Sequence, residues 1–179
     1  MEKDRQTANT ACLRGIGHNP ELVWIGGNNN KEVSGQVFFV NWDGEKQQLH
    51  ITKLPPLPMP LDNLSATYAD GCLYVAGGKG KPQTVPIGKD GSQTAPTNPL
   101  FSLQLTPSLQ KEWVRLPNFP GPARVQPVLT AQQSEDGIRL YLAGGFQLHP
   151  PIRKPLFAQI CFLIIRRQNS GEMKDSCLL

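Results

Sequence analysis

Two proline-rich segments of this sequence carry polar residues that could bind a polar ligand or act on it. Asp62 and Asn63 lie in the first segment (58–63), and Arg124 and Gln126 lie in the second (120–127). A carboxylate such as that of Asp62 can accept or donate a proton, and the planar fork of Arg124 suits a ligand carboxylate. Amide side chains such as those of Asn63 and Gln126 can contact hydroxyl groups. These four are the predicted binding residues, and no catalytic residue is assigned.

The elements that must position these segments are marked by a repeated phrase. A short apolar run ending in a glycine pair occurs three times, as VWIGG (23–27), LYVAGG (73–78) and LYLAGG (140–145). The pairs begin at residues 26, 77 and 144, which gives separations of 51 and 67 residues. A period near 50 residues is typical of the kelch β-propeller.

The intervals between the glycine pairs predict four strands per repeat. Alternating apolar and polar residues occupy 36–41, 48–54, 65–68 and 72–76, and then 100–105, 113–117, 125–130 and 138–143. Period-two runs bounded by Gly, Pro, Asn and Asp favour strands. We expect Trp113 to fill the wedge between neighbouring sheets, and the glycine pairs to hold the fold. The predicted fold class is all-β.

The order of strands also predicts which loops lie together. In a four-stranded meander, the link after the glycine pair and the link into the next repeat share one end of the sheets. At that end the sequence places Asn28, Asn29, Asn30, residues 79–97 and the two proline-rich segments. These loops are expected to border the central channel, where propellers bind ligands.

Three stretches of the sequence resemble a known family: GGNNNKEVSGQVFFVNWDG, LPPLPMPLDNLSATYADGCLYVAGG and WVRLPNFPGPARVQPV. Over about residues 20–145 the chain resembles the cyclically permuted mutarotase family of kelch proteins, relatives of N-acetylneuraminate epimerase. Residues 58–63 and 120–127 carry most of this resemblance. It implies a six-bladed propeller and an enzyme that interconverts the α and β anomers of sialic acid without a cofactor.

The resemblance implies a role for each predicted binding residue. Mutarotation needs a base for the anomeric hydroxyl, an acid for the ring oxygen and a cation for the C1 carboxylate. Arg124 is expected to hold the carboxylate, Gln126 and Asn63 to contact hydroxyl groups, and Asp62 to be a weaker acid–base candidate. Two structural alternatives stay open. Arg124 could instead bind backbone carbonyls between blades, and Asp62 could be a turn or capping residue.

The length of the chain limits what the resemblance can imply. Six blades of about 50 residues need about 300 residues, and the chain has 179. We therefore expect a partial propeller of about two to three blades. In the relatives, the Glu and Arg expected to transfer protons follow the glycine pair of a later blade, so the resemblance implies a mutarotase fragment that is inactive as this chain. Its open blade faces and sheet edges predict self-association.

The sequence predicts three segments. Residues 1–19 are polar, lack the apolar run of a signal peptide, and are interpreted as the remnant of a preceding repeat. Residues 20–145 hold the kelch repeats. Residues 146–179 lack a glycine pair and a tryptophan, and one hypothesis is that they are a frameshifted reading of the next blade. Shifted codons from Ala158 onward can spell TDLLSYNPATKQWRDEGQLP, which has a kelch pattern. The alternative is a divergent terminal segment, and the nucleotide sequence would distinguish the two.

The charge distribution argues against a nucleic-acid partner. Five of the 18 Lys and Arg residues lie in residues 146–179, against two acidic residues, so this segment contributes +3 of the net charge of +4. No basic stripe marks the repeats. Lys79, Lys81 and Lys89 are interpreted as a solvated loop. The apolar run 156–165 is shorter than the about 20 residues that span a bilayer, so no membrane span is predicted.

Cysteine and histidine predict neither a metal site nor a disulfide framework. The four cysteines show no C-x-x-C pairing, and the three histidines are isolated in the sequence. No cofactor is predicted, and the expected partner of the intact family member is a sialic acid. Two other function classes stay open: a non-catalytic kelch module that binds protein or glycan, and a metal-dependent kelch oxidase. No localisation is predicted for the chain, although the resemblance implies periplasmic or exported relatives.

Overall fold

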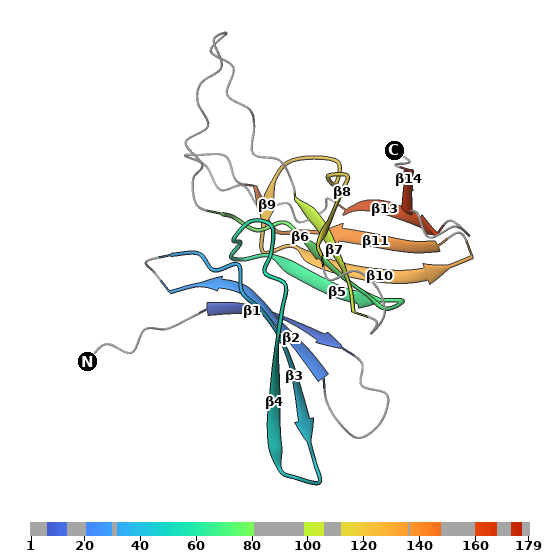
Figure 1. Cartoon of the computed structure of the whole chain (residues 1–179). Coiled ribbons are helices and arrows are strands. Elements are labelled where there is room, and N and C mark those ends of the chain that lie inside the picture. The colour runs from blue at the N-terminus through green and yellow to red at the C-terminus, as the bar shows by residue number, and fades with distance from the viewer. Residues whose placement is uncertain are drawn as a thin grey trace.

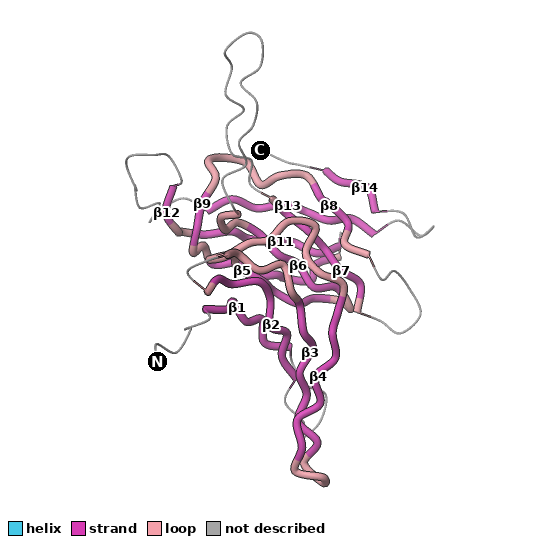
Figure 2. Tube along the Cα trace, turned by 60° about the vertical axis from the view of Figure 1, so that its left-hand side comes forward, coloured by secondary structure: helices cyan, strands magenta, loops and turns pink. Residues whose placement is uncertain are grey.

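The computed structural model describes residues 7–13, 21–29, 32–80, 99–105, 112–135, 137–147, 160–167 and 173–176. Every regular element in these residues is a strand, which confirms the predicted all-β fold class (Figure 2). In this described part, no helix has the length and apolar character needed to cross a membrane. The strands are β1 (Thr7–Leu13), β2 (Glu21–Asn28), β3 (Val37–Asp43), β4 (Gln48–Leu54), β5 (Ser65–Ala69), β6 (Cys72–Ala76), β7 (Leu100–Gln104), β8 (Val114–Leu116), β9 (Arg124–Val125), β10 (Val128–Ser134), β11 (Gly137–Ala143), β12 (Phe146–Gln147), β13 (Ile160–Arg167) and β14 (Met173–Ser176).

The strands form three antiparallel four-stranded sheets of the same topology. Their orders are β1-β2-β3-β4, β5-β6-β7-β8 and β10-β11-β13-β14, and a short β9–β12 pair accompanies the third sheet. Hydrogen bonding crosses both predicted segment boundaries. β1, which lies within residues 1–19, pairs with β2, and β13, which lies within residues 146–179, pairs with β11. The predicted segments remain predictions, but these strands belong to the same sheets as the repeats.

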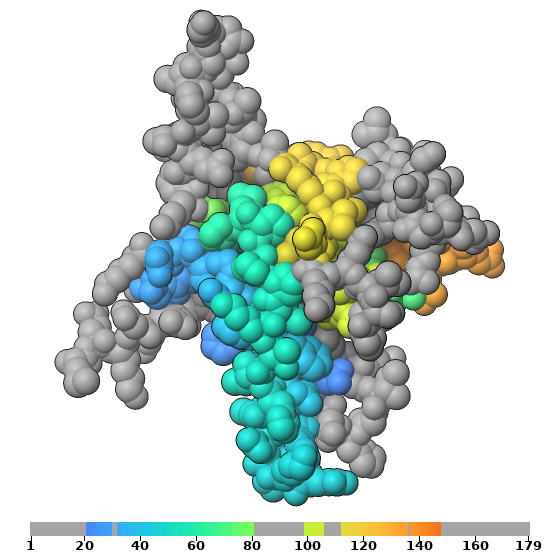
Figure 3. All heavy atoms as spheres, viewed as in Figure 1, coloured from blue at the N-terminus to red at the C-terminus, as the bar shows by residue number. Residues whose placement is uncertain are grey.

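The three sheets follow one another like the blades of a propeller. Their first strands lie together, with β5 between β1 and β10 (Figure 1). The β3–β4 hairpin of the first sheet projects from the rest of the molecule (Figure 3). The first strands β1, β5 and β10 thus form one inner surface, and the loops that precede them meet at one end of it.

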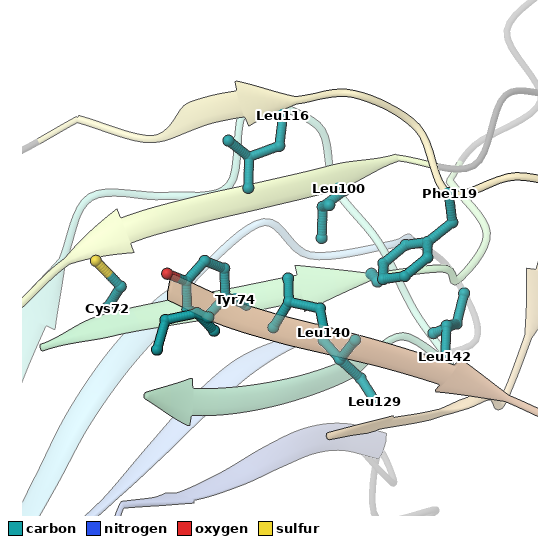
Figure 4. Close-up of a cluster of buried hydrophobic side chains, with 10 residues drawn as sticks. Cys72, Tyr74, Leu100, Leu116, Phe119, Leu129, Leu140 and Leu142 are labelled. Carbon is teal, nitrogen blue, oxygen red and sulfur yellow. The ribbon is translucent and has the colours of Figure 1, made fainter. Parts of the chain in front are cut away.

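Two apolar clusters join the sheets. Between the first and second sheets lie Val23, Ile25, Val37, Leu57, Leu61, Leu64, Leu73, Val75, Phe101 and Leu103. Between the second and third sheets lie Cys72, Tyr74, Ala76, Leu100, Leu116, Phe119, Leu129, Ile138, Leu140 and Leu142 (Figure 4). Burial of this apolar surface is the main favourable term that holds one sheet on the next.

The burial patterns of β6 and β11, each the second strand of its sheet, show which sheet lies between the other two. All five residues of β6 are buried, because Leu73 and Val75 face the first sheet while Tyr74 and Ala76 face the third. β11 instead alternates between buried and half-buried residues, as a strand covered on one face does.

The glycine pairs permit close contact between one sheet and the next. Gly77 has a φ of +70°, and a Cβ there would lie 2.9 Å from Pro127 Cγ and 3.0 Å from Arg124 O. Only glycine tolerates both the backbone conformation and the crowding. The expectation that the glycine pairs hold the fold is confirmed at this position.

The same pairs also hydrogen-bond to the following sheet. Gly27 N–H donates to Leu61 O at 3.0 Å, and Gly78 N–H donates to Arg124 O at 2.9 Å. Each acceptor belongs to the loop that leads into the next sheet's first strand. We call residues 60–64 and 122–127 the leading loops of the second and third sheets.

The predicted strands agree with the structure except around residue 125. Strand 125–130 was expected, but β10 begins at Val128, because Gln126 has a φ of +53° and interrupts the extended chain. Trp113 lies against the cluster between the first and second sheets, as expected, and its Nε1–H donates to Pro55 O at 2.9 Å. The tryptophan thereby also joins the second sheet to the loop that leaves the first.

Candidate functional site

The two leading loops place Asn63 and Gln126 side by side at the end of the inner strands. Both residues have a φ of +53°, a conformation that Asn adopts more readily than most residues. Gln126 N–H donates to Asn63 O at 2.8 Å, and Gln126 Nε2 donates to Asn63 Oδ1 at 3.2 Å. Gln126 is exposed and Asn63 is half-buried, so both amides can be reached by a ligand at this end.

Asp62 lies next to this pair, and its carboxylate is almost fully buried. Its Oδ2 accepts a hydrogen bond from Asn28 Nδ2 and lies 3.7 Å from Lys79 Nζ. The backbones of Asp62 and Lys79 exchange two hydrogen bonds of 2.9 Å, which fixes the two residues opposite each other. Buried carboxyl groups in proteins are normally paired and hydrogen-bonded in this way.

The second carboxylate oxygen of Asp62 differs from the first. Oδ1 is buried and has no hydrogen-bond partner in the described part of the chain. Buried polar atoms of this kind are rare in native structures and call for an explanation. The oxygen can accept a hydrogen bond from a ligand hydroxyl that reaches it.

Arg124 lies in the leading loop of the third sheet, but its side chain occupies a different environment. It has no exposed surface, and it donates from Nε to Pro122 O and from Nη1 to Gly144 O, both at 3.4 Å. This geometry matches the alternative in which the residue binds backbone carbonyls. The predicted role as a carboxylate clamp remains untested, and the described contacts do not favour it.

The structure therefore brings together Asp62, Asn63 and Gln126, as the order of strands predicted, and with them Lys79, from the segment 79–97 that was expected at the same end. The sequence had assigned Lys79 to a solvated loop; its side chain is indeed 46% exposed, and its Nζ also lies 3.7 Å from the buried carboxylate of Asp62. Its position directly after a glycine pair was the signal that could have identified it. Lys81 and Lys89 lie outside the described residues.

The metal-ligating residue types do not converge in the part of the chain that the structure describes. No group of three or more His, Cys, Asp or Glu residues in that part could hold a metal ion. His50 lies 3.6 Å from Asp43 Oδ2 on the distant β3–β4 hairpin. Cys72 Sγ donates to Gln104 Oε1 at 2.8 Å in the second sheet. His18 and His149 lie outside the described residues.

Comparison with known proteins gives similarity in structure alone. No family model and no curated protein matches the sequence. The structure of YjhT is similar with a TM-score of 0.56 and 15% identity, over 94% of this chain and 45% of that chain. A chain in the cryo-EM structure of RAG in complex with one melted RSS and one unmelted RSS is similar with a TM-score of 0.62 and 14% identity, over 96% of this chain and 51% of that chain.

These two similarities establish the fold. The chain spans about half the length of the solved structures that it matches. Together with the three antiparallel sheets, they support a β-propeller-like architecture of which this chain forms a part.

Proposed function

We propose that the chain is part of a propeller that acts on a sialic acid, as a mutarotase or epimerase that interconverts its α and β anomers. In this proposal the chain supplies part of the surface that binds the sugar and lacks the groups that transfer protons. The observation that carries it is the cluster of Asp62, Asn28 and Lys79 at the end of the inner strands, next to Asn63 and Gln126.

The chemistry of this cluster suits a polyhydroxylated acid. Lys79 is a half-exposed cation that a ligand carboxylate can approach, and it takes the role that the sequence had given to Arg124. The amides of Asn63 and Gln126 can donate hydrogen bonds to hydroxyl groups and accept hydrogen bonds from them. A cation and two amides thus lie at the surface, next to the buried carboxylate of Asp62.

The absence of activity follows from the resemblance to the mutarotase family. In that family the proton-transfer Glu and Arg are expected on a later blade than those that match this chain. Binding without anomer exchange is therefore the predicted behaviour of the 179-residue chain.

Saturation-transfer NMR with N-acetylneuraminate tests the proposal. We expect the chain to bind the sugar acid and to prefer it over the neutral N-acetylmannosamine. Lys79→Met should weaken binding by about tenfold or more, because a charge-assisted hydrogen bond is lost. Lys46→Met is the matched control, since Lys46 also pairs with an aspartate, at 3.4 Å, but on the distant hairpin.

Two outcomes would contradict the proposal. Equal binding of the neutral sugar would instead favour a non-catalytic glycan-binding module. Faster exchange between the anomeric NMR signals in the presence of the chain would show that the proton-transfer groups are present in it.

A further inference from the structure

The first sheet has one face that no described sheet covers. Val23 and Ile25 of β2 face the second sheet, so Trp24 between them faces the opposite way. Trp24 is 41% exposed, and with Phe38, Val40 and Ile51 it forms the apolar part of a hollow of about 500 Å³, whose polar part includes Asn28, Glu32 and Gln36. Strand pairing places Trp24 opposite Phe38, and Val40 opposite Ile51, on this same face. Apolar surface of this kind marks an interaction site.

The third sheet has a corresponding open face on its other side. Leu140 and Leu142 of β11 face the second sheet, so Tyr141 and Ala143 face away from it. Val128 pairs with Ala143 on that outward face and is 64% exposed. The described sheets thus leave two open faces: an apolar one on the first sheet, and a mixed one on the third, where Tyr141 Oη donates to Gln132 Oε1 at 3.1 Å.

The glycine pair of the third sheet repeats the backbone conformation that contacts the following sheet in the other two. Cβ atoms at Gly26 and Gly77 would crowd the leading loop of the following sheet, at Leu61 O and Arg124 O. Gly144 occupies the same position in the third sheet with a similar φ of +61°, and a Cβ there would have no described atom within 4 Å. The glycine is therefore in place, and the loop it would contact is not among the described residues.

The two open faces are complementary by the repeat itself. The first sheet packs one of its faces on the second sheet, and the second sheet packs the corresponding face on the third. The outward face of the third sheet is the same face in the repeat. The outward face of the first sheet likewise corresponds to the faces with which the second and third sheets receive their neighbours. A second copy of this chain therefore carries the partner that each open face lacks.

We propose that two copies of this chain associate head to tail and close a ring of six sheets. The third sheet of each copy packs on the first sheet of the other, which gives two equal interfaces related by a two-fold axis. Six lies within the usual range of about 4–8 propeller blades. The length agrees, because one copy spans 45% and 51% of the two solved chains that it resembles. This assembly does not depend on the proposed sugar-binding function.

Light scattering coupled to size-exclusion chromatography tests the ring. We expect a single species of twice the 19.7 kDa chain mass. Ile51→Glu and Val128→Glu should each give monomers, because each places a charge in both interfaces of the ring. Both residues are exposed in the single chain, so folding should be retained, which circular dichroism verifies. Thr52→Glu is the matched control, since Thr52 is also exposed but lies on the other face of β4.

Mixing the two variants distinguishes a head-to-tail contact from a face-to-itself contact. An equimolar mixture of Ile51→Glu and Val128→Glu can form one interface without a charge, so a population of dimers should reappear. A wild-type monomer, a mass above that of a dimer, precipitation, or a mixture that stays monomeric would each overturn the proposal.

Discussion

At the scale of single residues, Gly77 and Gly144 share a backbone conformation but not an environment. Replacing either by Ala introduces strain, because L side chains rarely adopt a φ near +65°. We expect Gly144→Ala to cost about 1 kcal/mol of unfolding free energy. Gly77→Ala should cost about 1–3 kcal/mol more, because its Cβ also meets Arg124 O and Pro127.

Urea unfolding in the Ile51→Glu background measures this difference, since that background is expected to keep the chain monomeric. Equal losses for the two alanine variants would mean that contact with the next sheet adds nothing to the strain of the glycine backbone.

Arg124 gives a second test at this scale, because its two interpretations predict different measurements. If the guanidinium serves the fold, Arg124→Met should lower the unfolding free energy by about 1–3 kcal/mol, since Pro122 O and Gly144 O lose their donor. Urea unfolding measures the loss, and sugar binding by NMR is measured on the same protein. Unchanged stability with lost binding would instead support the carboxylate clamp.

The candidate site could be predicted only in part from the sequence, because residue type and loop position are local while pairing is not. The strand order placed Asp62, Asn63 and Gln126 at one end, as observed. It could not show that the Asp62 carboxylate is buried against Lys79, since their separation of 17 residues includes two strands and a glycine pair. Nor could it show that Arg124 is directed inward, toward Gly144 O.

At the scale of elements, the β3–β4 hairpin contains a titratable turn. The backbone amide of Lys46 lowers the pKa of Asp43 below its ordinary value of 3.8, with smaller contributions from the Lys46 side chain, the Glu45 amide and His50. Because the pKa is lowered on folding, the turn is stabilised above pH 3.8. That stability is lost as the pH falls through the lower, folded-state pKa.

An NMR titration of the hairpin checks this expectation. The Asp43 carboxyl should titrate with a midpoint below 3.8, and the amide signals of Glu45 and Lys46 should shift with the same midpoint. A midpoint at or above 3.8, or amide signals that do not follow it, would show that the turn does not hold the ionised carboxylate.

The positions of the strands were the most predictable feature of the fold. The alternation of apolar and polar residues along a strand follows from which of its faces is covered. Strands β4 and β6 have the predicted bounds of 48–54 and 72–76. The predicted start of this strand at residue 125 was wrong, because a non-glycine residue at positive φ, here Gln126, leaves no sign in an alternating pattern. β13 and β14 were not predicted as strands of the third sheet, since residues 146–179 lack the glycine pair and the tryptophan on which the repeat was recognised.

Across the whole molecule, the number of faces of a sheet that are covered by other sheets should determine how strongly its amides are protected from hydrogen exchange. In the monomeric Ile51→Glu variant, β6 has neighbours on both faces, whereas β2 and β11 each have a described sheet on one face only. Exchange should therefore be slowest in β6 and faster in the other two strands, because local opening is easier where less apolar surface is buried.

In the wild-type chain, closure of the proposed ring would cover the outward faces of both terminal sheets. Hydrogen exchange followed by mass spectrometry should then show β2 and β11 slowed toward the rate of β6, with little change in β6 itself. Protection that is the same in the wild type and in Ile51→Glu would mean that the open faces stay exposed. The three-sheet chain would then be stabilised by its two internal interfaces alone.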